Sequence, residues 1–235
     1  MKIIDITMPL YNGVPTGREH TFFQNHPLWP EAFKMEETRS YEQHGVQSFV
    51  YTMFMEPATR FIVPSYRKEY RDGPRLHNMD LSRVVLRDMV VVDTPKGDDE
   101  ILEADELEAA FRKAPVQRAD ALLIRSGWGD NERYFKMGYD YKLRGPHFND
   151  ASVNRLLDLM AENGSDLWLY DMSDMRGVDK RTGVAGGFAI RAGIMAVGGV
   201  VNCGAITQTR AKLIVLPLKI QGASMAPCRA VVIEE

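Results

Sequence analysis

Short runs of β-branched and aliphatic residues recur along this chain, and amphipathic helix patterns lie between some of them. Runs of this length and composition, bounded by turn residues, predict strands. A chain that alternates strands with helices in this way is typical of an α/β domain, so we predict a mixed central sheet. The predicted strands span residues 3–7, 86–92, 121–126, 167–170, 197–201, 214–218 and 228–233.

Residues 47–55 also alternate as a strand does, but both of their faces are largely apolar. One face carries Phe49, Tyr51 and Met53, and the other includes Val50 and Phe54. A strand that is apolar on both faces is typically covered on both sides. The pattern therefore predicts a central position in the sheet.

Two segments place apolar residues at the spacing of one helix face. Residues 103–114 follow this pattern, and Pro115 ends the segment. Residues 151–162 follow it as well, with Asn149 or Asp150 available as the N-cap. We predict two amphipathic helices that cover the sheet.

The charge balance restricts the classes of partner. The 235 residues include 29 Lys plus Arg and 32 Asp plus Glu, a net charge of -3, which provides no overall basic field for nucleic acid or an anionic membrane. Apolar stretches such as 194–201 are shorter than the ~20 residues of a spanning helix, and residues 1–10 lack the regions of a signal peptide. We expect a cytoplasmic protein with neither a nucleic-acid nor a membrane partner.

Nothing in the sequence divides the chain into parts. No repeat, low-complexity tract or flexible linker is present, so we predict a single domain over residues 1–235. Cys203 and Cys228 are the only cysteines, and we expect both to be small core residues. A long loop follows the first strand, and its aromatic residues Phe22 and Trp29 are candidates to cover a substrate.

Four segments, in their order and spacing, resemble the cyclase superfamily that includes bacterial kynurenine formamidases and isatin hydrolases. They read DITMPL at 5–10, LSRVVLRDMVVVD at 81–93, ADALLIRSGWGD at 119–130 and VLPLKIQGASMAPCRAVVI at 215–233. The resemblance covers nearly the whole chain. It implies a swivelling β/β/α fold, a small-molecule substrate and a homo-oligomer, a dimer or tetramer, usually with the active site near a subunit interface.

The chain departs from that superfamily at its metal site. The superfamily's signature is HxGTHxDxPxH, whose three His and one Asp bind one or two metal ions, usually zinc or manganese. The corresponding residues 56–66 read EPATRFIVPSY, which keeps Thr59 and Pro64. The ligand positions carry Glu56, Arg60, Ile62 and Tyr66. A guanidinium has no lone pair and isoleucine has no donor atom, so we predict that the protein uses no metal or other cofactor.

The residues at these positions allow a different chemistry. Arg60 is a candidate to polarise a carbonyl group and stabilise an oxyanion. Tyr66 is a candidate proton donor, and Glu56 a candidate general base if burial raises its pKa against the effect of Arg60. The alternative is a buried Glu56–Arg60 ion pair that fills the space of the metals, with Tyr66 packed beside it.

Several other residues are candidates to bind a substrate. His147 precedes a predicted helix and is either a ligand contact or a solvated loop residue. Polar residues after the strand at 167–170 lie where sites often form, although turn hydrogen bonds explain them equally well. The candidate substrate-binding residues are Thr59, Trp29, Phe22, His147, Asp171, Ser173 and Asn202, the last near the position of a metal-binding Glu in the superfamily.

Three functions are compatible with these observations. The first is a metal-independent enzyme that acts on a small, cyclic or aromatic amide, lactone or keto compound by hydrolysis, cyclisation or elimination. The second is a catalytically inactive relative that binds a small molecule or a partner. The third is a metal-dependent hydrolase with atypical ligands. We favour the first, because Glu56, Arg60 and Tyr66 occur together while Thr59 and Pro64 are kept.

Overall fold

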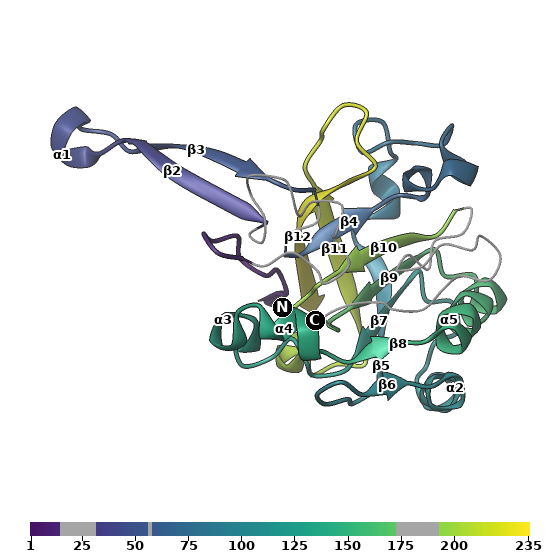
Figure 1. Cartoon of the computed structure of the whole chain (residues 1–235). Coiled ribbons are helices and arrows are strands. Elements are labelled where there is room, and N and C mark those ends of the chain that lie inside the picture. Colours follow the sequence, from purple (N-terminus) through teal and green to yellow (C-terminus); the bar gives the residue numbers. More distant parts are fainter. Residues whose placement is uncertain (15–31, 56–57, 173–192) are drawn as a thin grey trace.

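A mixed eight-stranded sheet forms the centre of the protein (Figure 1). The computed structural model describes residues 1–14, 32–55, 58–172 and 193–235. The strand order is β1-β12-β11-β5-β7-β9-β10-β4, and an additional pairing between β12 and β4 closes the sheet into a barrel. The strands are β1 (Lys2–Asp5), β4 (Arg60–Ile62), β5 (Arg87–Asp93), β7 (Ala121–Arg125), β9 (Leu167–Tyr170), β10 (Met195–Gly198), β11 (Arg210–Pro217) and β12 (Met225–Glu234).

Strand direction within the barrel is mixed, as the sequence predicts. Strands β5, β7, β9 and β10 are parallel neighbours, and β4 runs antiparallel to both β10 and β12. The remaining barrel pairs are antiparallel. Each predicted strand of the barrel is confirmed to within a few residues. The very short β4 has too few residues to give a periodic signal, and the sequence did not predict it.

Two helices, α2 (Ala104–Lys113) and α5 (Asp150–Asn163), lie against the outside of the barrel (Figure 1). Both predicted helices are confirmed. Asn149 is the N-cap of α5, and its side chain accepts a hydrogen bond from the Ser152 backbone N–H. The other elements are α1 (Tyr41–His44), α3 (Arg133–Met137), α4 (Asp140–Arg144), the paired strands β6 (Ile101–Leu102) and β8 (His147–Phe148), and the 3-10 turns Pro64–Tyr66, Lys68–Tyr70, Leu81–Arg83 and Cys203–Ala205.

The prediction that residues 47–55 form a central strand is wrong. The strand exists as β3 (Ser48–Met53), but among the described residues it pairs only with β2 (Phe33–Arg39), in a separate two-stranded hairpin. Figure 1 shows this hairpin extending away from the barrel. Its apolar residues are therefore largely exposed in the single chain, although their pattern is that of a buried strand.

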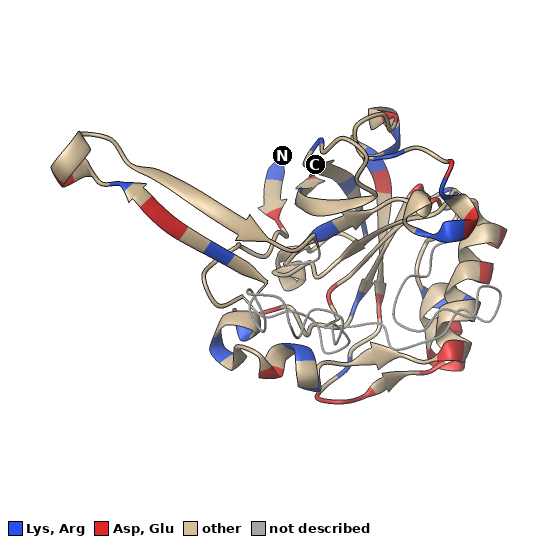
Figure 2. Cartoon of the chain, turned by 45° about the horizontal axis from the view of Figure 1, so that its top comes forward, with Lys and Arg blue, Asp and Glu red and all other residues tan. Residues whose placement is uncertain are grey.

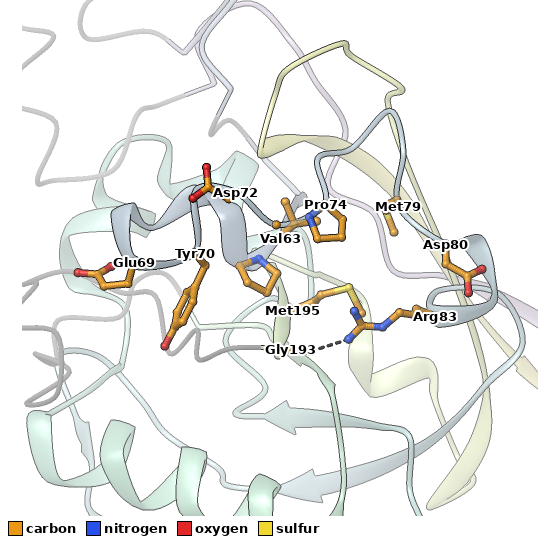
Figure 3. A pocket seen from close by; sticks show the side chains of 12 residues that line it. Val63, Glu69, Tyr70, Asp72, Pro74, Met79, Asp80, Arg83, Gly193 and Met195 are labelled. Atoms are coloured by element: carbon orange, nitrogen blue, oxygen red, sulfur yellow. Dashed lines mark hydrogen bonds between the residues drawn. The ribbon is translucent and has the colours of Figure 1, made fainter.

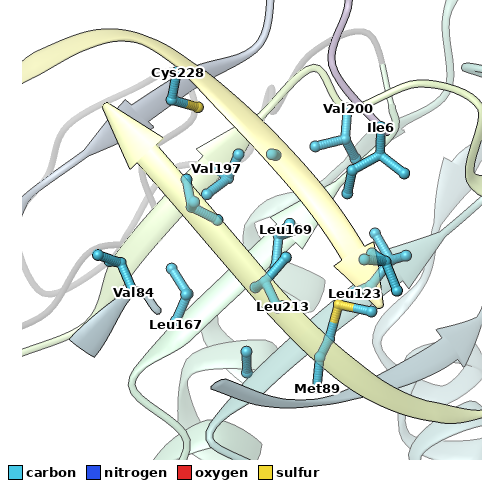
Figure 4. Packing of buried hydrophobic residues seen from close by; sticks show 14 of the residues in the cluster. Ile6, Val84, Met89, Leu123, Leu167, Leu169, Val197, Val200, Leu213 and Cys228 are labelled. Atoms are coloured by element: carbon cyan, nitrogen blue, oxygen red, sulfur yellow. The ribbon is translucent and has the colours of Figure 1, made fainter. Parts of the chain in front are cut away.

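Alternate residues of the barrel strands form two separate apolar clusters. The inner cluster fills the barrel and includes Phe61, Leu123, Leu169, Val197 and Leu213 (Figure 4). The outer cluster joins the other face of the same strands to α2 and α5 and includes Ile62, Trp168, Tyr170, Phe111 and Leu156. Because strand side chains alternate, β4, β5, β7, β9, β10 and β12 contribute to both clusters, whereas β1 and β11 contribute only to the inner one.

Both cysteines are buried in the inner cluster, as predicted. None of the helices in the described part of the chain is long and apolar enough to cross a membrane.

Substitution of Leu123 by alanine tests the barrel interior. Leu123 is fully buried, so the truncation leaves a cavity, and we expect the free energy of unfolding to fall by about 2–5 kcal/mol. Leu216→Ala on β11 is the matched control, because Leu216 is half-exposed, and it should cost less than about 0.5 kcal/mol. Chemical denaturation measures both, and equal costs would contradict a filled barrel.

Candidate active site

The short strand β4 determines where the candidate site lies. Because β4 runs antiparallel to β10, its first residue, Arg60, lies beside Gly198, the last residue of β10. Tyr170, the last residue of β9, lies on the other side of Gly198. Ligands of α/β sheets commonly bind outside the carboxyl ends of the parallel strands, which is where this row of residues lies.

Arg60 and Tyr170 contact each other across Gly198. Arg60 shares the outer face of β4 with Ile62, and its Nη2 donates a hydrogen bond to the Tyr170 hydroxyl at 3.2 Å. The Arg60 residue is 8% exposed and Tyr170 is 1% exposed. A Cβ atom on Gly198 would lie 2.3 Å from Tyr170 Oη and 3.2 Å from Arg60 Cζ. The missing side chain at Gly198 therefore provides the space in which the guanidinium and the phenol meet.

Tyr66 lies on the same side of the sheet. It ends the 3-10 turn Pro64–Tyr66 and packs, half-buried, against the outer cluster that contains Trp168 and Tyr170. The Trp168 and Tyr170 rings stack with centroids 5.0 Å apart. The structure thus brings Arg60 and Tyr66 to one face.

The Thr59 hydroxyl is hydrogen-bonded to the protein backbone on both sides. Its hydroxyl accepts a hydrogen bond from the Met8 backbone N–H at 2.8 Å and donates one to the Gly199 carbonyl oxygen at 2.7 Å. These two bonds tie the segment after β1 to the end of β10, and they use the hydroxyl's single donor and one of its two acceptor sites. A direct contact between Thr59 and a substrate remains a prediction.

Asp171 holds the ends of two strands together. Its carboxylate accepts hydrogen bonds from the Ser126 backbone N–H and hydroxyl, both at 2.7 Å, and from the Gly127 N–H at 2.8 Å. Burial raises the pKa of the Asp171 carboxyl to about 6, although the bonds from Ser126 and Gly127 act in the opposite direction. The geometry identifies Asp171 as a residue that orders the turn after β7, and its contact with a substrate stays a prediction.

The raised pKa of Asp171 predicts how stability depends on pH. Between pH 3.8 and about 6 the folded state keeps a proton that the unfolded chain releases, so this group's contribution to stability falls as the pH rises through that window. Asp171→Asn removes the titration. We expect the stability difference between wild type and variant to shrink from pH 4.5 to pH 6.5 in denaturant titrations. A constant difference would contradict a raised pKa.

Of the remaining predicted residues, the structure describes Asn202 and His147. Asn202 is exposed, and its side-chain amide donates a hydrogen bond to the Asp5 carbonyl oxygen at 3.1 Å. His147 is half-buried in β8, which pairs with β6, so the alternative of a solvated loop residue is wrong. Their contact with a substrate is untested. Glu56, Phe22, Trp29 and Ser173 lie outside the described residues.

Sequence reasoning missed Tyr170 and Gly198. Tyr170 ends a correctly predicted strand, and Gly198 lies in the predicted strand at 197–201. The available signal was the alternation of Trp168 and Tyr170 on one strand face, but a strand pattern does not reveal which residue lies opposite on a neighbouring strand.

Two of the superfamily's ligand positions carry residues that do not fit a metal ion. Arg60 is permanently cationic, and Ile62 is fully buried in the outer cluster. A divalent ion ~4 Å from the guanidinium would be repelled by about 8 kcal/mol at an effective dielectric constant of ~20. Among the described residues, no group of three or more His, Cys, Asp and Glu side chains is arranged to hold a metal.

A separate cavity of about 390 Å³ is shown in Figure 3. Its lining begins at Val63, just after the last residue of β4, whereas Arg60 is the first residue of that strand. Val63 and Met195 line it, so it adjoins the amino end of β10. Arg83 lies in its wall and donates a hydrogen bond to the Gly193 carbonyl oxygen at 2.5 Å. None of Arg60, Tyr66 and Tyr170 is among its lining residues, so this cavity is separate from the candidate site.

A double-mutant cycle tests whether the Tyr170 hydroxyl lies over Gly198. Gly198→Ala places a methyl group against the Tyr170 hydroxyl, and we expect it to cost about 1–3 kcal/mol of stability. In a Tyr170→Phe background the cost should be smaller, because the nearest remaining ring atom is Cζ at 2.7 Å. Chemical denaturation of the four proteins gives the coupling energy between positions 198 and 170. Additive costs would show that the added methyl group at position 198 does not contact the Tyr170 hydroxyl.

Comparison with known proteins supports the sequence resemblance. The sequence profile of the family described as "Putative cyclase" matches residues 4–172. No curated protein matches the chain.

Solved structures share the fold. Isatin hydrolase A from Ralstonia solanacearum has 19% identity and a TM-score of 0.74, with 100% of this chain and 92% of that chain covered. An isatin hydrolase bound to the product analogue thioisatinate has 15% identity and a TM-score of 0.74, with 100% and 93% covered. A predicted metal-dependent hydrolase from Bacillus stearothermophilus has 16% identity and a TM-score of 0.68, with 98% and 97% covered. The predicted swivelling β/β/α fold is confirmed.

Proposed function

The chain belongs to the cyclase family, and on that premise we propose that it is a hydrolase or cyclase type of enzyme that works without the family's metal. The observation that carries the proposal is the buried Arg60 guanidinium, which donates a hydrogen bond to Tyr170 at the carboxyl ends of β9 and β10. It occupies a position where the family's signature has a metal ligand. A catalytic metal ion activates a water molecule and stabilises negative charge on an oxygen, and a fixed cation can perform the second of these tasks.

The proposed substrate is a small organic molecule with a reactive carbonyl group, such as a cyclic or aromatic amide, lactone or keto compound. Support comes from the fold shared with isatin hydrolases, one of which was solved with the product analogue thioisatinate. A net charge of -3 does not favour nucleic acid or an anionic membrane as a partner. The two free, buried cysteines are compatible with the cytoplasm, where we place the enzyme.

In the proposed mechanism Arg60 donates hydrogen bonds to the substrate carbonyl oxygen as negative charge develops on it. Tyr170 is a positioning residue, because its hydroxyl fixes the guanidinium over Gly198. Tyr66, on the same face, donates a proton to the leaving group. Glu56 accepts a proton from the attacking water or from the substrate, and this role rests on the sequence alone because Glu56 lies outside the described residues.

Two assays test the proposal on a panel of formamides, lactams and lactones. We expect turnover that is unchanged by a chelator, and a loss of about 100-fold in kcat/KM for Arg60→Ala, since one oxyanion donor contributes roughly 3 kcal/mol. Arg71→Ala is the matched control, because Arg71 is an exposed arginine near the same segment. It should keep wild-type turnover.

The other outcomes identify the alternatives. A folded protein with no turnover on the panel would favour a catalytically inactive relative that binds a small molecule or a partner. Turnover that a chelator abolishes would favour a metal-dependent hydrolase with atypical ligands. Full activity of a folded Arg60→Ala variant would contradict the role of Arg60.

A further inference from the structure

The cavity shown in Figure 3 is distinct from the candidate active site. Met195, the first residue of β10, lines the cavity, whereas Gly198, the last residue of that strand, lies beside Arg60. Three residues of strand span about 10 Å, so Met195 and Gly198 lie roughly that far apart. The volume of about 390 Å³ is within the range of roughly 300–1,000 Å³ that small-molecule sites have. The cavity is therefore large enough for a small ligand.

The middle of the cavity is apolar. Figure 3 shows Val63, Pro74 and Met195 at the centre of the lining, with Tyr70 and Met79 on either side. Burial of apolar surface against such walls is the main source of binding free energy for a small ligand. These walls therefore favour a ligand with an aromatic or other apolar body.

One polar group reaches this apolar lining. Figure 3 shows the Arg83 guanidinium extending toward Met195. Its Nε and Nη2 donate hydrogen bonds to Asp166 Oδ2 at 3.2 Å and 2.9 Å, and Nη2 also donates one to the Gly193 carbonyl oxygen at 2.5 Å. These bonds fix the guanidinium, while Nη1 donates no hydrogen bond to a residue that the structure describes. The Nη1 N–H groups are therefore free to donate to an acceptor oxygen of a ligand.

The carboxylates of the described lining already have partners. Glu69 Oε2 lies 3.5 Å from Arg67 Nε, and Asp72 Oδ2 lies 3.8 Å from Arg71 Nε. The Asp80 carboxylate accepts a backbone hydrogen bond at 2.9 Å. Figure 2 shows charges of both signs in the turns that follow β4. A charged ligand would lose its hydration in the apolar cavity and would find no unpaired countercharge on these residues, so a neutral ligand is favoured.

We propose that this cavity binds a small neutral molecule that has an apolar body and a carbonyl oxygen, such as an aromatic amide, ester or lactone. The apolar body packs against Pro74 and Met195, and the carbonyl oxygen accepts a hydrogen bond from Arg83 Nη1. The inference does not rest on the proposed function, because none of Arg60, Tyr66 and Tyr170 lines the cavity. It gives the chain a second ligand site.

Methionine methyl NMR with benzamide as the neutral probe locates the ligand. We expect benzamide to shift the methyl resonances of Met79 and Met195, in the wild type and equally in Arg60→Ala. Met8 reports on the candidate active site instead, because its backbone N–H donates a hydrogen bond to the Thr59 hydroxyl. Benzoate, an anion of similar shape, should bind at least about 10-fold more weakly at the cavity.

Two variants test the contacts. In Arg83→Met, Asp166 keeps its hydrogen bond from Arg87 Nη2 at 2.7 Å, so we expect a folded protein that binds benzamide about 10-fold more weakly. Arg71→Ala is the matched control, because Arg71 is an exposed arginine of the same region that does not line the cavity, and it should keep wild-type affinity. Met79→Trp fills the cavity with an indole ring and should abolish the binding of benzamide there.

Three results would overturn the inference. The first is the absence of Met79 and Met195 shifts up to the solubility limit of benzamide, or shifts at Met8 alone. The second is wild-type affinity in both Arg83→Met and Met79→Trp. The third is benzoate binding at the cavity as tightly as benzamide. Because none of these readouts uses turnover, failure of this inference is distinguishable from failure of the proposed function.

Discussion

The pairing of β4 with both β10 and β12 is the constraint on which the rest of the structure depends. The three residues of β4 close the barrel by pairing with both strands. Their side chains also pack on both faces of the sheet, since Phe61 belongs to the inner cluster and Ile62 to the outer one. The same alternation turns Arg60 to the outer face at the carboxyl end of β10. The position of the candidate catalytic cation is therefore a consequence of barrel closure, and it does not depend on a loop.

A cation that is part of the chain differs in kind from a bound metal ion. A guanidinium cannot be lost to a chelator or exchanged, and it offers directional hydrogen bonds to an oxygen that gains charge. It cannot activate a water as a metal does, so the base must come from another group. Burial of the charge is costly, and the contact with Tyr170 across Gly198 provides one compensating hydrogen bond. The proposed function therefore assigns these two tasks to different residues.

Sequence reasoning predicted the elements whose pattern is local. The strand at 167–170 and the cap at Asn149 follow from alternation and capping chemistry, and the structure has both. It could not predict the Arg60–Tyr170 contact, because that contact depends on the register of three strands far apart in the chain. It misplaced residues 47–55 because apolar periodicity indicates that a strand is covered, but it does not indicate whether the same chain covers it.

In the proposed function the Arg60 guanidinium occupies a place from which it excludes the metal of the family. Elemental mass spectrometry of the wild-type protein, expressed with zinc and manganese supplied and then desalted, measures whether a metal is bound. We expect far less than one metal ion per chain in the folded protein. A stoichiometric metal that Arg60→Ala leaves in place would show that another ligand set exists, and it would contradict the exclusion of a metal by Arg60.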